Sequence, residues 1–242
     1  MISAQTLLLI FILFLPPTIG AAASPDNSVT LFTHGDTPLL SPTKEGTLEG
    51  PALDLFRCAM TRLERPFSVQ RAPLSRARQI IAELDKAVWF PSAYRGDADR
   101  MAHSVGPAGS LDIYWYKSKV NQLDPNSEAF KQSAVVTTYK GSAMEGQLRR
   151  DGYAFKQGSA DRSTLVFMLL NGEVDAFVAV DFRDRLPKET LQKLTDHASI
   201  TIKDRVPTAF RVANLFYEND TAFTGKFRQA FGTCLSNAAP EK

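Results

Sequence analysis

Apolar and polar positions along this chain follow two periods in turn. Short runs rich in β-branched and aromatic residues, typical of buried strands, are followed by segments with apolar residues three and four apart, which are typical of helices. The predicted strands are 28–33, 67–71, 88–91, 135–139, 175–180 and 210–217, and the predicted helices are 50–63, 74–84, 143–150, 161–170 and 222–235. Strands that alternate with helices favour an α/β architecture with largely parallel sheets.

The N-terminal segment has a different character. Residues 7–15 read LLLIFILFL, a run too short to cross a bilayer, which needs about 20 apolar residues. Two prolines follow it, and the alanines at 21–23 suit a signal peptidase. We expect residues 1–23 to be a cleavable signal peptide and the protein to be periplasmic; the alternative is an uncleaved anchor. No cysteine stands near the cleavage site to accept a lipid.

Export changes the interpretation of the two cysteines, Cys58 and Cys234. In an oxidising compartment a pair of cysteines suggests a disulfide. Each cysteine lies in a helical pattern, so a bond would join the first helix to the last; the alternative is two separate buried thiols.

Composition and motifs exclude several classes of function. The formal charge of +2 is small, and basic and acidic residues are interspersed, so neither nucleic acid nor an anionic membrane is indicated as a partner. The chain contains no G-x-S-x-G, H-E-x-x-H or P-loop motif, and its three histidines lack metal-ligand spacing. We therefore expect no cofactor and no metal.

The first candidate site follows the predicted strand 135–139. Ligands of open α/β sheets bind at the carboxyl ends of strands, and Gly141 allows a tight turn and close approach there. Ser142 then begins a helix whose free N–H groups suit a carboxylate or phosphate. The alternative is a plain capped helix, because Ser142 and Glu145 have the spacing of a capping box.

Two further candidates lie at strand ends. Asp181 directly follows 175–180, where it could hold an ammonium group or begin the next loop paired with a nearby arginine. The loop after 88–91 contains Ser92, Tyr94 and Arg100, and arginine binds carboxylates bidentately; the alternative is a solvated polar loop.

Several segments, in this order, resemble the family 3 periplasmic solute-binding proteins of the polar amino-acid type. They are GTLEGPALDLFRCAMTRL (46–63), APLSRARQIIAEL (72–84), DADRMAHSVGP (97–107), TYKGSA (138–143) and NGEVDAFVAVD (171–181). The resemblance implies the type II periplasmic-binding fold, in which two lobes, each a mostly parallel sheet flanked by helices, are joined by two crossovers. We place lobe 1 at 24–117, lobe 2 at 118–205 and the return to lobe 1 at 206–242.

The resemblance also implies a function. The protein would be a monomer, not an enzyme, that captures a small polar, amino-acid-like solute for an ABC importer. The alternatives are a dehydratase acting on cyclohexadienyl acids and a sensor module that presents its ligand to a receptor. The ligand-binding residues implied are Arg100 and Ser92 with Tyr94 of the same loop, Gly141, Ser142 and Asp181 from the second lobe, Asp36 from the first loop, and Arg76.

Overall fold

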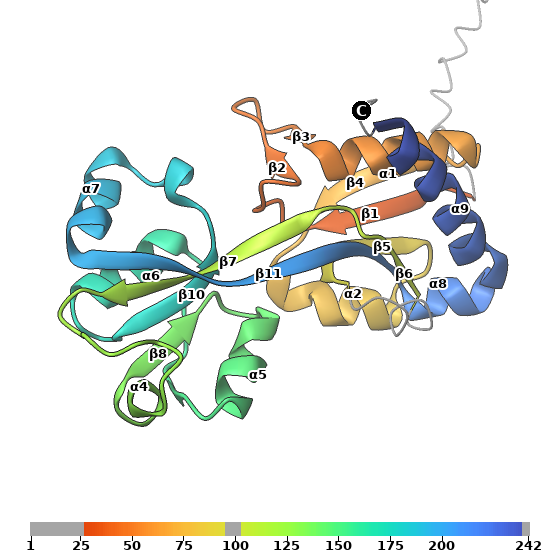
Figure 1. Cartoon of the computed structure of the whole chain (residues 1–242). Helices are drawn as coiled ribbons and strands as arrows, with labels where there is room; N and C mark the ends of the chain where they lie inside the picture. The colour runs from red at the N-terminus through yellow and green to blue at the C-terminus, as the bar shows by residue number, and fades with distance from the viewer. Residues whose placement is uncertain (1–26, 95–102, 239–242) are drawn as a thin grey trace, which may run out of the picture.

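The computed structural model describes residues 27–94 and 103–238, and it shows two lobes joined by two long strands (Figure 1). The lobe on the right in Figure 1 contains both ends of the described chain, and the other lobe is built from its middle. The strands of the lobe on the right, which we call the first lobe, are β1 (Val29–Thr33), β4 (Phe67–Arg71), β5 (Ala87–Ala93) and β6 (Ser104–Val105), with the small hairpin β2 (Ser41–Pro42) and β3 (Leu48–Glu49). Its helices are α1 (Pro51–Arg62), η1 (Leu74–Arg76), α2 (Ala77–Glu83), α8 (Asn214–Asn219) and α9 (Thr221–Ala238).

The second lobe follows the same plan. Its strands are β8 (Val135–Thr138), β9 (Ala154–Phe155) and β10 (Ala176–Val180), and its helices are α4 (Glu128–Ser133), α5 (Ala143–Arg150), α6 (Arg162–Leu170), η2 (Arg183–Arg185) and α7 (Lys188–His197). β8 pairs in parallel with both β9 and β10, as β1 does with β4 and β5 in the first lobe. The α/β class with mostly parallel sheets in each lobe is therefore confirmed.

Two antiparallel strands, β7 (Ser110–Ser118) and β11 (Ala198–Val212), connect the lobes. The sheet order is β4-β1-β5-β11-β7-β10-β8-β9, so this pair lies between the parallel strands of the two lobes. Lys117 and Arg205, where we predict the chain to pass between lobes, lie within these strands. The exact limits of the lobes remain a prediction.

Each lobe has its own hydrophobic core. In the first lobe, Phe56 of α1 packs against Phe210 of β11 and Phe227 of α9, with ring centroids 5.4 and 5.6 Å apart. In the second lobe, one cluster gathers around Trp115 and another around Tyr116, because neighbouring residues of β7 point to opposite faces of the sheet. Two separate cores allow each lobe to behave as a rigid body.

The last predicted strand is wrong in its second half. β11 ends at Val212, and the residues after Ala213 form α8 rather than more strand. The apolar residues at 215–217 look strand-like, but α8 folds back and buries Phe216 against Phe223 of α9, with the two tilted ring centroids 4.3 Å apart. Tertiary packing therefore decides the helical conformation of this segment.

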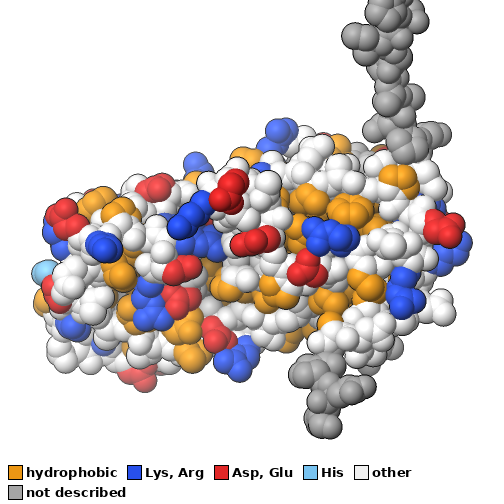
Figure 2. Space-filling view, turned by 90° about the horizontal axis from the view of Figure 1, so that it is seen from above, with side chains coloured by type: hydrophobic (Ala, Val, Ile, Leu, Met, Phe, Trp, Pro, Cys, Tyr) orange, Lys and Arg blue, Asp and Glu red, His pale blue; other side chains and the backbone are white. Residues whose placement is uncertain are grey.

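Cys58 and Cys234 form the predicted disulfide, which joins α1 to α9 with their Cα atoms 6.1 Å apart. The predicted signal peptide lies outside the described residues. Within the part of the chain that the structure describes, no helix has the length and apolar character needed to cross a bilayer. Figure 2 shows basic and acidic side chains interspersed over one face of the molecule, as the sequence indicated.

Candidate functional site

The loop that follows β1 carries the first group of the site. Thr33 and His34 shape the loop through their side chains: Thr33 Oγ1 accepts from the Gly35 N–H at 3.0 Å, and His34 Nδ1 accepts from the Asp36 N–H at 3.2 Å. Gly35 adopts a left-handed φ of 71°, a conformation that glycine takes at little energetic cost. This turn holds Asp36 at the carboxyl end of β1.

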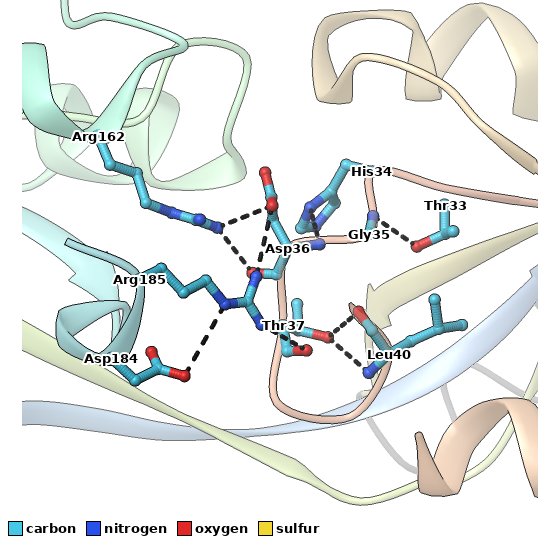
Figure 3. Close-up of polar contacts among 9 residues, drawn as sticks. All are labelled: Thr33, His34, Gly35, Asp36, Thr37, Leu40, Arg162, Asp184 and Arg185. Carbon is cyan, nitrogen blue, oxygen red and sulfur yellow. Dashed lines mark hydrogen bonds and ion pairs between the residues drawn. The ribbon is translucent and has the colours of Figure 1, made fainter. Parts of the chain in front are cut away.

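Asp36 contacts two arginines of the second lobe (Figure 3). Arg162 Nη2 donates to the Asp36 carbonyl oxygen at 3.0 Å and lies 3.3 Å from its Oδ1. Arg185 Nη1 donates to the same Oδ1 at 3.4 Å, and its Nη2 donates to the Thr37 carbonyl oxygen at 3.4 Å. The three charged side chains are only 17–25% exposed, so solvent screens these contacts less than surface pairs. They join the two lobes.

Arg162 is the first residue of α6, and Asp161 caps that helix by accepting from the Thr164 N–H at 2.7 Å. The cap fixes where the helix begins and therefore where Arg162 projects. Its guanidinium also lies over the Phe182 ring, 5.6 Å from the centroid, a cation–π arrangement that favours the charged group in a partly dry position.

His34 is a neutral hydrogen-bonding group at this site. Burial lowers the pKa of its imidazole to about 4; Asp36 opposes this effect, and Arg162 and Arg185 reinforce it. Because Nδ1 accepts from the Asp36 N–H, the proton of the neutral ring is on Nε2, which is a donor.

Two adjoining hollows lie beside these groups, between the lobes. We call the first the apolar hollow; its cavity volume is about 110 Å³. It is lined by Leu74, Ile113, Thr138, Tyr139, Ser142, Met144, Arg162, Leu165, Val178, Ala179, Val180 and Phe182. We call the second the polar hollow; it is lined by His34, Asp36, Arg71, Ala72, Pro73, Leu74 and Tyr139.

Leu74 and Tyr139 line both hollows, so together the hollows form one inter-lobe cleft. Tyr139 has a raised pKa, first because it is partly buried and then because the Asp36 carboxylate is near, so its hydroxyl stays protonated. The cleft therefore combines charged groups from both lobes, neutral donors and an apolar wall.

The turn at Gly141 brings the lobes into close contact. A Cβ at this position would lie 2.9 Å from the backbone N and Cα of Ser75, which belongs to η1 of the first lobe. Ser142 caps α5 by accepting from the Met144 N–H at 3.1 Å, while the Glu145 carboxylate accepts from Gln157 at 2.6 Å instead of returning to the helix start. The start of α5 thus has a serine cap but no carboxylate folded over it.

No family model matches this chain, and no curated protein matches it. Solved structures do. A histidine kinase sensor domain with similarity to periplasmic binding proteins has a TM-score of 0.65 at 12% identity, covering 87% of this chain and 91% of the other. An ancestral amino-acid-binding protein, described as a precursor of cyclohexadienyl dehydratase, has a TM-score of 0.63 at 12% identity over the same shares, 87% and 91%.

A third match is a Wolinella succinogenes protein described as the binding component of an ABC transporter, complexed with lysine. It has a TM-score of 0.63 at 14% identity and covers 88% of this chain and 91% of that chain. The chain has the two-lobed fold of periplasmic binding proteins. At these identities the likeness concerns the fold.

Within this periplasmic-binding fold, the structure brings together only part of the predicted site. Asp36 lines the polar hollow and Ser142 the apolar hollow, while Gly141 lies at the contact between lobes. Arg100, the arginine expected to grip a carboxylate, lies outside the described residues.

Asp181 differs from the expectation that it shares a cleft with Ser142. Its carboxylate accepts from the Arg183 N–H at 3.1 Å and from Arg183 Nε at 2.9 Å, and Arg183 lowers its pKa. It lines a separate hollow with Pro38 and Leu191. The physical reason is local: η2 turns the chain directly after β10, so an arginine two residues ahead reaches back to the carboxylate. This is the loop arrangement that we gave as the alternative.

Three other predicted residues also lie elsewhere. Tyr94 lines a hollow of the first lobe beside Arg228. Ser92 is held in β5 opposite Ala209 of β11. Arg76 is exposed on η1, with Nη2 3.4 Å from Gln79. Ser92 and Tyr94 were predicted from their distance in sequence to a strand end and Arg76 from its place at a helix start, and none of the three lines the two cleft hollows.

The sequence did not predict His34, Arg71, Tyr139 and Arg162, which line the cleft, or Arg185, which contacts Asp36 beside it. A signal for two of them was present, because His34 follows a predicted strand and Arg71 ends another, and carboxyl ends of strands line the cleft of this fold. Arg162 also follows a predicted helix cap, so its place at a helix start was available from the sequence.

Proposed function

We propose that the protein is a solute-binding protein that captures a small polar, amino-acid-like solute between its two lobes and delivers it to an ABC importer. The observation that supports this best is the inter-lobe cleft, in which Asp36 of the first lobe faces Arg162 and Arg185 of the second. A solute that contacts both walls favours the closed arrangement of the lobes, and an importer can recognise that arrangement.

The periplasmic location, the monomeric state and the importer partner belong to the same proposal. The periplasmic location is supported by the apolar N-terminal run of the sequence and by the disulfide, which suits an oxidising compartment. Asp36, Gly141 and Ser142 are the predicted residues that we retain for the site, together with Arg162 and Arg185.

Binding is favoured over dehydratase chemistry by the state of the carboxylates. A general acid in the cleft needs a raised pKa. Asp181 has a lowered pKa because Arg183 binds it, and the Glu145 carboxylate is hydrogen-bonded to Gln157. Asp181 therefore lacks the raised pKa that this role requires.

A thermal-unfolding screen tests the proposal. The purified protein is heated with each of the amino acids, short organic acids, polyamines and small sugars, and every solute that raises Tm is titrated by calorimetry. A solute at 100 times its Kd should stabilise the protein by about 2.7 kcal/mol. Incubation with prephenate and arogenate serves as the control for turnover. If no solute in the panel raises Tm, or if aromatic product accumulates, the proposal is wrong.

A further inference from the structure

Arg162 has hydrogen-bond donors that no described residue uses. Its contacts with Asp36 involve only Nη2, and a guanidinium has five N–H donors. Nε and Nη1 donate to none of the residues in the described ranges. The side chain is only 17% exposed and lines the apolar hollow, where an unmet donor is unfavourable.

The polar hollow adds two more donors. Arg71, on the first lobe, makes no ion pair or side-chain hydrogen bond with any residue that the structure describes. His34 presents a neutral Nε2–H, as its bond from the Asp36 N–H requires. Donors from both lobes thus face the cleft without a protein acceptor in the described part of the chain.

The carboxylates near the cleft, unlike these donors, have partners within the protein. Asp36 is held by two arginines, and Asp161 accepts from both the N–H and the hydroxyl of Thr164. The two guanidiniums offset the Asp36 charge and so weaken its attraction for an incoming ammonium group, whereas an incoming carboxylate meets donors that are already available.

The wall of the apolar hollow indicates what the rest of the ligand is. Leu74, Met144, Leu165, Val178 and Val180 supply an aliphatic surface, and the volume is about 110 Å³. An engineered cavity of about 150 Å³ holds benzene, so this hollow suits a compact apolar group of roughly five carbon atoms.

We propose that the ligand is a small organic carboxylate whose charged group binds Arg162, beside Arg71 and His34, and whose compact apolar body fills the apolar hollow. This inference rests on the proposed function and names the chemical class of its solute. Because two guanidiniums already offset the Asp36 charge, we expect an α-ammonium group to add little to the affinity.

Three related compounds separate the contributions of the two charged groups. L-Leucine carries both, 4-methylpentanoate lacks the ammonium group, and 3-methylbutylamine lacks the carboxylate. Calorimetry on the purified protein should show that 4-methylpentanoate binds at least as tightly as L-leucine and that 3-methylbutylamine gives no saturable heat.

Variants then test the two halves of the site. Arg162→Gln should weaken binding of 4-methylpentanoate by about 30-fold or more, the smallest loss expected when one partner of a partly buried charge pair is removed. Arg149→Gln, which removes the same charge from an exposed position of α5, should leave binding unchanged. Ala179→Val narrows the apolar hollow and should weaken the binding of 4-methylpentanoate more than the binding of propanoate.

The outcomes distinguish this inference from the function on which it rests. If L-leucine or a polyamine binds and 4-methylpentanoate does not, the inference is overturned and the proposed function stands. The same holds if Arg162→Gln and Arg149→Gln bind the acid equally. If no solute of the wider panel binds, both fall.

Discussion

The contact between the lobes at Gly141 provides a direct test of lobe closure. An alanine Cβ at this position would lie 2.9 Å from the N and Cα of Ser75 on the opposite lobe, and both atoms are backbone, so they cannot rotate away. We predict that Gly141→Ala hinders closure and therefore weakens binding of any solute held between the lobes, although residue 141 loses no contact with that solute.

The magnitude follows from two separable effects. Gly141 has φ of 82°, and an L-residue in that region costs about 1–2 kcal/mol; this strain is present whether the lobes are open or closed. The contact with Ser75 exists only when they are closed. Overpacking of this kind costs about 1–3 kcal/mol. Because apparent affinity scales with the fraction of molecules able to close, Kd should rise by about 5- to 150-fold.

Gly152→Ala is the matched control. Gly152 has nearly the same φ, 87°, but a Cβ there would meet nothing within 4 Å. Both variants should lose a similar amount of unfolding free energy in urea, and only Gly141→Ala should lose affinity in calorimetry with a solute found by the screen. Equal affinities for the two variants would refute the reasoning, because the contact with Ser75 would then be absent from the bound form.

Two further predictions concern stability. Replacing Cys58 and Cys234 by serine opens a loop closed over 176 residues, and should lower the free energy of unfolding by up to about 5 kcal/mol in urea titrations while leaving solute affinity unchanged; a loss below 1 kcal/mol would contradict the chain-entropy account. His34 has a folded pKa of about 4 against 6.5 in the unfolded chain, so only the unfolded state takes up a proton as pH falls between those values, and stability falls with it. Between pH 7 and 4.5 the free energy of unfolding should therefore fall by about 2–3 kcal/mol more in this protein than in His34→Asn, whose amide oxygen can still accept from the Asp36 N–H. Parallel profiles of unfolding free energy against pH would show that His34 is not buried as a neutral ring.

Much of the fold could be predicted because most of its elements are defined locally. β4 and α5 have the predicted bounds, 67–71 and 143–150, since each lies between residues that stop a strand or cap a helix. The connecting strands β7 and β11 were mostly missed. The first part of β11 is rich in polar residues and largely exposed, and its conformation depends on pairing with residues of β7 that lie 80 to 97 positions earlier in the chain. Local pattern contains no information about such a partner.

The site was harder to predict for a related reason. Strand ends indicate which residues can reach the cleft; that rule found Ser142, while Asp36 came from the family resemblance. The strand-end rule also selected Asp181, whose carboxylate is bound by Arg183 two residues ahead, and it gave no weight to Arg162, which is 126 residues away from Asp36. Whether a charged side chain in this fold serves the cleft or its own loop depends on which counter-charge the closed lobes bring within about 4 Å, where the interaction is strongest. For Asp36 both counter-charges come from the other lobe, so this carboxylate contributes to closure, and any solute must bind where part of the closing interaction is already made by the protein itself.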